Sequence, residues 1–206
     1  MVLIKGRPFL EYLIELLVKN GIVEAILLLG YLPEKIVSHF GDGNRFGLKI
    51  NYLISDIADE TGTRVRKASG LLADKFLLMY ADNYWPLNLK IMTDFYSKAK
   101  VLVTTTIYNN QDGFGEYGRE NNVYVKNGLV YCYDRHRQDL RLNGVDIGFF
   151  IVDKKVVSKM PAANFSFEKD FLSQLIKRKQ LAGFCTDERY LTITNPAMVK
   201  AIEKYF

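Results

Sequence analysis

The residue of this chain whose type and place most clearly suggest chemistry is Asp82. It follows residues 76–80, an uninterrupted apolar run of the length of a buried strand. A charge at the end of such a strand is costly unless it meets a metal, a cation or a ligand, and open α/β sheets bind their ligands at this edge. One carboxylate with phosphate oxygens and water commonly holds Mg²⁺. The alternative is that Asp82 caps the segment that follows.

Two arginines at the start of a predicted helix could hold phosphate. Residues 61–66 read Thr-Gly-Thr-Arg-Val-Arg, so a glycine turn and a hydroxyl group precede Arg64 and Arg66. Backbone N–H groups and the helix dipole favour phosphate at such a start, and guanidinium groups add paired hydrogen bonds. A surface turn with solvated arginines would have the same sequence.

Two more carboxylates have suggestive neighbours. Asp134-Arg135, beyond a predicted hairpin, could combine an acceptor for a hydroxyl group with a phosphate clamp, or could form an ordinary exposed salt bridge. Asp146 lies in residues 143–148, an apolar stretch with a glycine on either side of it. Glycines such as Gly148 let a ligand approach the backbone closely.

Several other chemistries have little support. His39 and His136 lie far apart in the chain, and no serine or cysteine occupies a nucleophile-elbow sequence. The chain has neither a P-loop nor the glycine fingerprint of dinucleotide-binding folds. Cys132 and Cys185 are too few for a disulfide framework or a zinc site. We therefore expect a reducing cytoplasm.

The composition indicates a compact globular protein. Its 206 residues are 49% hydrophobic and 25% charged, which is enough for a core and unlike a disordered chain. Lys and Arg (28) exceed Asp and Glu (23) only slightly and are scattered, which favours a solvated surface or an anionic small molecule over nucleic acid. No apolar segment reaches the roughly 18–20 residues of a membrane span, and the first ten residues lack the order of a secretory signal. We expect neither nucleic acid nor membrane as a partner.

Helical and strand patterns alternate along the first half of the chain. Helical spacing follows Pro8 as far as Asn20 and recurs at 33–40, 64–72 and 89–99, whereas 25–29, 48–54, 76–80 and 101–108 have strand patterns. The second half shows a hairpin around Asn127-Gly128, a strand at 145–152, a helix at 167–179, a late strand pair at 181–186 and 190–194, and a final helix. This order predicts an α/β fold with a parallel, doubly wound sheet.

Several short motifs, taken in order, resemble one protein family. They are Lys5-Gly6-Arg7-Pro8-Phe9-Leu10-Glu11-Tyr12-Leu13, Gly30-Tyr31-Leu32-Pro33-Glu34-Lys35-Ile36, Phe40-Gly41-Asp42-Gly43, Phe46-Gly47, Gly62-Thr63 and Tyr80-Ala81-Asp82-Asn83-Tyr84. Their order and spacing are similar to those of the sugar-phosphate nucleotidyltransferases, which make NDP-sugars from an NTP and a sugar 1-phosphate. The likeness covers nearly the whole chain and is most specific in its first half. It implies one GT-A-like (Rossmann-like) α/β domain over residues 1–206, with a mixed, mostly parallel sheet flanked by helices in three αβα layers.

The resemblance implies a nucleotide half in the lower-numbered part of the chain. The acid that binds the essential Mg²⁺ in the family is matched by Asp82, and Asn83 and Tyr84 beside it are expected to contact substrate. Gly62-Thr63 matches the turn that lines the site of the nucleotide base in the family. The implied reaction is in-line attack of the sugar phosphate on the α-phosphorus with pyrophosphate leaving. Arg64 or Arg66 is expected to contact phosphate, and Arg64 is expected to be catalytic together with Asp82.

The resemblance places the sugar site in the higher-numbered part. The family has a Glu-Lys pair that holds a sugar hydroxyl and the sugar phosphate, and Asp134-Arg135 matches it. The Asn-Ala-Gly strand start of the family is matched by Asp146-Ile147-Gly148. These residues are therefore expected to bind the sugar 1-phosphate.

Two departures from the family pattern affect the expected activity. Family members begin with a strand and a Gly-Gly-x-Gly-Thr-Arg-Leu signature followed by Pro-Lys-Pro, and this chain opens at Met1, where that Pro-Lys-Pro would have just ended. We therefore expect the N-terminal strand and the loop that holds the triphosphate to be missing. Thr192 stands where the family often has a second metal-binding Asp, and a neutral hydroxyl group does not supply that charge.

These departures leave two functions open. If the chain is complete as given, catalysis is expected to be poor or absent, and the protein would bind a sugar phosphate or NDP-sugar, as a homo-oligomer or as a regulatory subunit paired with a full-length homologue. If it is a fragment of a longer reading frame, the enzyme interpretation holds, with an atypical second metal site. We favour a nucleotidyltransferase that uses an NTP, a sugar 1-phosphate and Mg²⁺. The base and the sugar are not readable from these motifs.

Overall fold

The computed structural model describes residues 1–114 and 117–206 of the chain. Its strands and helices are, in order, β1 (Leu3–Ile4), β2 (Arg7–Pro8), α1 (Phe9–Lys19), β3 (Glu24–Leu29), α2 (Pro33–Phe40), β4 (Lys49–Ile54), α3 (Thr61–Lys67), β5 (Lys75–Met79), β6 (Asn83–Tyr84), α4 (Leu89–Ala99), β7 (Val103–Tyr108), β8 (Val123–Lys126), β9 (Leu129–Tyr133), β10 (Val145–Asp153), α5 (Ser173–Lys177), β11 (Leu181–Thr186), β12 (Leu191–Thr192) and α6 (Pro196–Tyr205). Of the helices that the described residues form, none is both long and apolar enough to cross a membrane.

The chain divides into two compact units that interleave in the sequence. The first unit comprises residues 1–74 and 154–171, and the second comprises residues 75–153 and 172–206. Asp82 and Asp146 therefore belong to the second unit, whereas Arg64 belongs to the first. The single domain expected over the whole chain stays a prediction.

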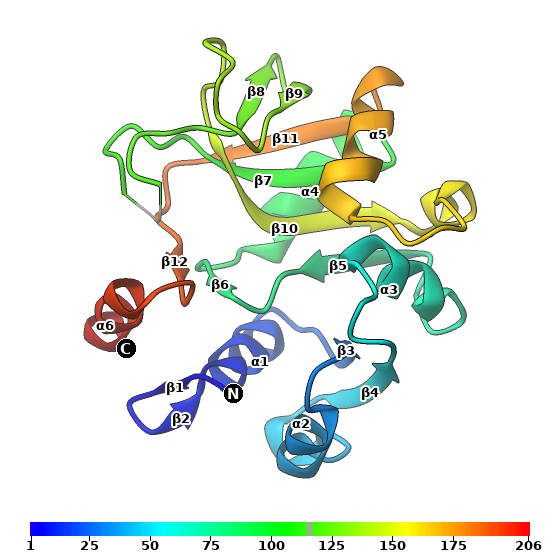
Figure 1. Cartoon of the computed structure of the whole chain (residues 1–206), viewed down its shortest axis with the longest axis vertical. Helices are drawn as coiled ribbons and strands as arrows, with labels where there is room; N and C mark the ends of the chain where they lie inside the picture. Colours follow the sequence, from blue (N-terminus) through cyan, green and yellow to red (C-terminus); the bar gives the residue numbers. More distant parts are fainter. Residues whose placement is uncertain (115–116) are drawn as a thin grey trace. The chain divides into compact units, whose positions relative to one another are not determined.

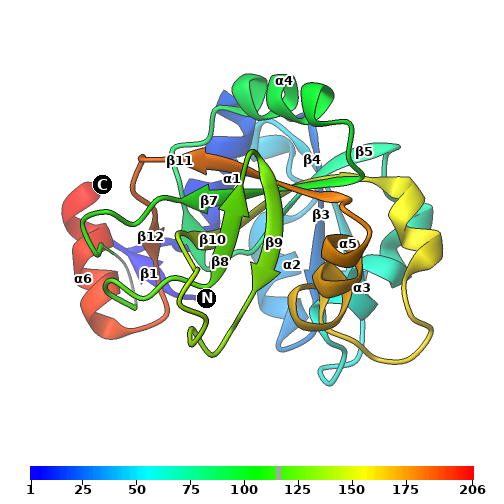
Figure 2. The ribbon, with the colours of Figure 1, turned by 90° about the horizontal axis from the view of Figure 1, so that it is seen from above.

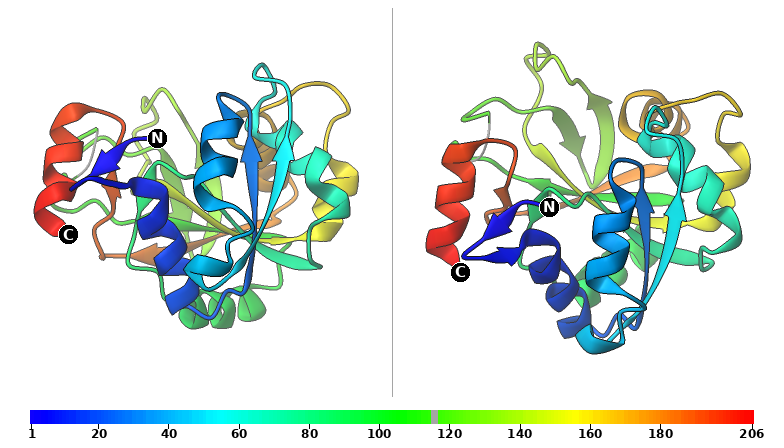
Figure 3. Two further views of the ribbon diagram at one scale, coloured as in Figure 1. Left: turned by 90° about the horizontal axis from the view of Figure 1, so that it is seen from below. Right: turned by 60° about the horizontal axis from the view of Figure 1, so that its bottom comes forward.

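In the first unit, a parallel pair of strands carries two helices on one face. β3 and β4 pair along their full lengths, and Figure 3 shows them side by side with α2 next to them. Ile14 of α1, Phe40 of α2 and Ile50 of β4 are at most 4% exposed and form one core cluster. Ala25 and Leu27 of β3 pack against that cluster, because alternate residues of a strand point to the same face.

The second unit is built on a six-stranded sheet with the order β5-β10-β7-β11-β9-β8 (Figure 1). β5, β7, β8 and β11 run in one direction, and β9 and β10 run against them. The predicted mixed sheet, in which most strands share a direction, is confirmed. Neighbouring strands of this described sheet are nevertheless parallel only where β7 meets β11, since β10 lies between β5 and β7.

Helices cover both faces of this sheet, as the predicted three layers require. α4 and α5 lie on opposite faces (Figures 1 and 2); α4 contacts β10 and β11, and α5 contacts β9. α4 begins where Asn88 Oδ1 accepts a hydrogen bond of 3.2 Å from the backbone N–H of Ile91, the usual way to satisfy a free helix N–H group. β7 is buried at every position, so the sheet centre forms the core of the unit.

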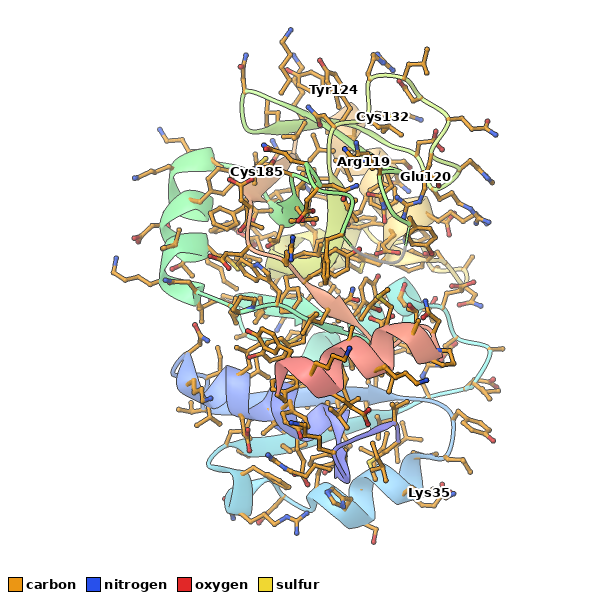
Figure 4. All side chains as sticks on the ribbon, turned by 90° about the vertical axis from the view of Figure 1, so that its left-hand side faces the viewer. Lys35, Arg119, Glu120, Tyr124, Cys132 and Cys185 are labelled. Atoms are coloured by element: carbon orange, nitrogen blue, oxygen red, sulfur yellow. The ribbon has the colours of Figure 1, made fainter. Side chains whose placement is uncertain are left out.

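The hairpin predicted at Asn127-Gly128 is confirmed. Both residues have positive φ, 52° and 75°, as a type I′ turn requires, and β8 and β9 pair across the turn. In this hairpin Tyr124 lies opposite Cys132, and Figure 4 labels both side chains. Cys132 and Cys185 carry free thiols.

The late strand pair expected at 181–186 and 190–194 is wrong in its partners. β12 pairs with β6, so that Asn83 lies opposite Thr192 and Tyr84 lies opposite Leu191. The reason is that β11 already has β7 on one edge and β9 on the other, which leaves no edge for β12. This pairing brings the end of the chain to the turn that follows β5.

Candidate functional site

Asp82 lies in the turn between β5 and β6, with its side chain exposed. The backbone N–H of Ile193 donates to the backbone oxygen of Asp82 at 3.0 Å, which ties this turn to β12. Thr192, the position of the expected second metal ligand, lies opposite Asn83 and is 2% exposed. Its hydroxyl oxygen is 3.4 Å from that of Thr194. The structure thus brings the two expected metal-ligand positions together and supplies one carboxylate there.

An irregularity near the start of β10 brings that strand to the same turn. The pairing register shifts after Asp146, and Gly148 has φ 76°. The backbone N–H of Tyr80 donates to the oxygen of Gly148 at 3.1 Å, and Asn83 Nδ2 donates to the oxygen of Ile147 at 3.1 Å. A Cβ atom on Gly148 would lie 2.7 Å from Tyr80 Cδ2, so glycine is needed for this approach. Asn83 and Gly148, both predicted site residues, therefore lie together.

Asp146 points its carboxyl group into the structure. Its Oδ1 accepts hydrogen bonds from Thr105 Oγ1 at 2.8 Å and from the backbone N–H of Gly148 at 2.9 Å. Its Oδ2 is closed to solvent and has no hydrogen-bond partner among the described residues. Burial raises the pKa of Asp146 to about 6, while the hydrogen bonds from Gly148 and Thr105 act in the opposite direction.

Tyr84, predicted to contact substrate, has aromatic neighbours at the end of the chain. Its ring lies 4.8 Å from the ring of Phe206 and 5.7 Å from that of Tyr205, measured between centroids. Such edge-on and tilted contacts contribute about 0.5–1.5 kcal/mol each. The residues that follow β12 therefore pack against β6, and the role of Tyr84 toward substrate stays a prediction.

Asp134 closes the turn after β9. Its carboxylate accepts backbone hydrogen bonds from His136 and Gln138, each at 2.9 Å, and from Asp139 at 3.1 Å. These bonds, that from Gln138 most of all, hold the pKa of Asp134 below its usual value. Arg135 beside it is exposed. The turn thus fixes the acid and leaves the guanidinium group at the surface, where it can reach an anion.

Gly62 and Thr63 lie in α3 of the first unit, against residues 162–167. Thr63 exchanges two hydrogen bonds with Phe165: its backbone N–H donates to the Phe165 oxygen at 3.2 Å, and its Oγ1 accepts from the Phe165 N–H at 3.0 Å. Gly62 is pressed against the same residue, since a Cβ atom there would lie 2.2 Å from Phe165 Cε2. The glycine is therefore required by packing, whatever its role toward a nucleotide base.

We expect Gly62→Ala to lower the free energy of unfolding by about 1–3 kcal/mol, because the added methyl group meets a ring that is 3% exposed and has little room to move. Urea unfolding followed by far-UV circular dichroism measures the change. Gly70→Ala is the matched control, since a Cβ atom there meets nothing within 4 Å. Equal stability of the two variants would contradict the packing argument.

Arg64 and Arg66 donate to loop carbonyl groups. Arg64 Nε donates to Asp59 O at 2.9 Å, and one of its terminal nitrogens donates to Asp56 O at 3.0 Å. A terminal nitrogen of Arg66 donates to Ala162 O at 2.9 Å. Both guanidinium groups thus hold loops of the first unit, and their contact with phosphate stays a prediction.

Three buried polar residues, two of which bond to Asp146, were not anticipated from the sequence. Thr105 donates to its carboxyl group, and Asn122 Oδ1 accepts from its backbone N–H at 2.9 Å. Asn110, 6% exposed, donates from Nδ2 to the backbone oxygen of Gly118 at 3.0 Å. The available signal was polarity where a buried strand favours apolar residues: β7 contains three successive threonines, and asparagines stand on both sides of the loop that follows it.

Comparisons with known proteins agree with one another. A family model described as Nucleotidyl transferase matches residues 1–127. The chain is 28% identical over 206 residues to a D-glycero-alpha-D-manno-heptose 1-phosphate guanylyltransferase of Aneurinibacillus thermoaerophilus, covering 98% of this chain and 86% of the relative. It is 27% identical over 207 residues to a probable glucose-1-phosphate cytidylyltransferase of Bacillus subtilis (strain 168), covering 89% and 78%.

Solved structures show the same fold. The crystal structure of HddC from Yersinia pseudotuberculosis matches with a TM-score of 0.83 and 25% identity, covering 100% of this chain and 89% of that chain. A putative glucose-1-phosphate thymidylyltransferase from Bacillus anthracis matches with a TM-score of 0.83 and 14% identity, covering 99% and 84%.

Proposed function

Because this chain belongs to the nucleotidyl transferase family, whose model matches residues 1–127 of its 206, we propose that it transfers a nucleotidyl group from an NTP to a sugar 1-phosphate. The products are an NDP-sugar and pyrophosphate. The family inferred from the sequence motifs is confirmed, and two relatives are named for a heptose 1-phosphate and for glucose 1-phosphate. These names support a sugar 1-phosphate as the acceptor.

One observation carries the proposal: the exposed Asp82 turn lies beside the start of β10. Asn83 bonds to Ile147 O and Tyr80 bonds to Gly148 O, so an acid and a glycine-lined backbone segment meet at the carboxyl end of β5. Substrates of α/β folds bind at such ends. The arrangement suits a phosphate-bearing ligand that approaches both an acid-bound cation and a close backbone.

Asp82 fits a divalent cation held mainly by substrate. Within residues 1–114 and 117–206 no three His, Cys, Asp or Glu side chains cluster closely enough to form a metal site. Mg²⁺ commonly uses one or two carboxylates, with phosphate oxygens and water completing its six ligands, so the single exposed carboxylate is sufficient. When bound, Mg²⁺ would offset the negative charge on the phosphates as pyrophosphate leaves.

The chain's own residues would orient the two substrates. We assign Arg135 to the sugar phosphate, Gly148 to close backbone contact with the sugar, and Gly62 with Thr63 to the side of the base. Attack by the sugar phosphate needs no covalent intermediate with the protein, so positioning and charge supply the rate gain. A cytoplasmic location fits the proposal, because NTPs are made there.

Pyrophosphate release with a substrate panel tests this function. We expect turnover above background for at least one pair among GTP, CTP, UTP or dTTP with heptose 1-phosphate, glucose 1-phosphate or mannose 1-phosphate, and loss of that turnover with EDTA. Thermal stabilisation by a sugar phosphate or NDP-sugar without turnover by any pair would contradict catalysis. That result would favour the binding or regulatory alternative, which the neutral, buried Thr192 beside the Asp82 turn supports.

A further inference from the structure

A buried carboxylate closes the bulge at the start of β10. Asp146 Oδ1 accepts the Gly148 N–H across two residues at 2.9 Å, at the place where the pairing with β7 loses its register. A carboxylate that folds back on its own chain in this way stabilises an irregular backbone. It helps to hold Gly148 at φ 76°, in the left-handed region.

Two residues outside the bulge hold Asp146, one through its carboxyl group and one through its backbone N–H. Thr105, on β7 and 0% exposed, donates to the same Oδ1. Asn122, 7% exposed, accepts the backbone N–H of Asp146. These partners are uncharged, and Oδ2 has none among the described residues. A buried carboxylate with one oxygen that has no partner is costly, and the two hydrogen bonds that Oδ1 accepts offset part of that cost.

The bulge in turn supports the Asp82 turn. Its two carbonyl oxygens, those of Ile147 and Gly148, accept hydrogen bonds from Asn83 Nδ2 and from the Tyr80 N–H. Tyr80 and Asn83 flank Asp82 by two residues and one residue. A shift of the bulge would therefore move both anchors of the turn that carries the acid.

We propose that Asp146 is a positioning residue that acts through Gly148 and Ile147 to hold the Asp82 turn in its working geometry. This inference rests on the proposed function, because the geometry of the Asp82 turn matters for activity only if Asp82 takes part in the reaction. In this proposal the Asp146 side chain holds the backbone of the bulge and does not contact substrate. Positioning requires an acceptor oxygen and does not require a negative charge, because the single oxygen Oδ1 accepts both hydrogen bonds.

Two substitutions of similar size separate the acceptor from the charge. Asp146→Asn keeps an oxygen for Gly148 and Thr105, whereas Asp146→Leu removes it. We expect amide hydrogen exchange at Tyr80 to be at least 10-fold faster in Asp146→Leu than in Asp146→Asn, under native conditions and after correction for global stability. We also expect kcat/KM to fall about 10- to 100-fold in Asp146→Leu and to stay within about 3-fold of the unaltered chain in Asp146→Asn.

The Mg²⁺ dependence of activity is a second readout. The Mg²⁺ concentration for half-maximal activity should rise in Asp146→Leu and not in Asp146→Asn. If Asp146→Leu does not fold, Asp146→Ala replaces it, because it also removes the acceptor oxygen for Gly148 and Thr105. Equal Tyr80 exchange in the Asn and Leu variants would overturn the inference. If the exchange difference is observed but the unaltered chain shows no turnover, the inference stands and the result counts against the proposed function.

Discussion

Asp82→Asn is expected to lower kcat by about 10²- to 10³-fold while leaving the fold intact. The change keeps the shape of the side chain and removes its charge, and a neutral amide binds a divalent cation far more weakly than a carboxylate does. Asp82 is exposed, and its backbone oxygen, which accepts the Ile193 N–H and ties the turn to β12, is unchanged by the substitution.

Pyrophosphate release over a range of Mg²⁺ concentrations measures the effect. The variant should need much more Mg²⁺ for half-maximal activity, because the cation loses its protein anchor. Glu188→Gln is the matched control, since it removes another exposed carboxylate of the same unit. Equal activity of Asp82→Asn and the unaltered chain at every Mg²⁺ concentration would remove Asp82 from the mechanism.

Local signals in the sequence predicted several elements closely, although the helix expected at 64–72 is α3 at Thr61–Lys67. The helix expected at residues 89–99 is α4 without any change of bounds, and the strand expected at 76–80 is β5 shifted by one residue. Asn127-Gly128 forms its turn because both residues tolerate positive φ. These features depend on side chains a few positions apart, which a single sequence displays directly.

Pairings between distant segments were not readable in the same way. β10 enters between β5 and β7, and β12 pairs with β6 instead of β11. Strand order depends on which edges remain free once the earlier pairs have formed, and no local pattern encodes that. The contact between Asn83 and Ile147 joins residues 64 positions apart, so the neighbourhood of Asp82 could be inferred only through the family resemblance.

The contacts of the candidate arginines and acids were also not predictable from the sequence. A guanidinium group has the same sequence signature whether it binds phosphate or a carbonyl group, and Arg64 bonds to the loop at Asp56 and Asp59. Asp134 likewise could be identified as a polar residue beyond a hairpin, but not as the acceptor of three backbone N–H groups. Residue types predicted which side chains could take part in chemistry. The partners that these side chains contact depend on the loops around them.

Asp146→Asn is expected to flatten part of the dependence of stability on pH. Burial raises the pKa of Asp146 in the folded chain from 3.8 to about 6, so between those values the folded state binds more protons than the unfolded state. The free energy of unfolding therefore falls as pH rises through this window, by up to about 3 kcal/mol for a shift of this size. Asparagine does not titrate, so the variant should gain stability relative to the unaltered chain at pH 7.5 and gain little at pH 4.

Urea unfolding of both proteins at intervals from pH 4 to pH 8 measures this effect, because the titrating groups that do not interact with Asp146 cancel in the difference. Asp134→Asn should behave in the opposite sense: backbone hydrogen bonds lower the pKa of Asp134, so its carboxylate contributes stability at neutral pH that is lost as the solution becomes acidic. Parallel curves for Asp146→Asn and the unaltered chain would show that the carboxyl group is hydrated in solution. In that case the cost of burying its charge would be absent, and the positioning task would rest on the hydrogen bonds that Oδ1 accepts from Thr105 and Gly148.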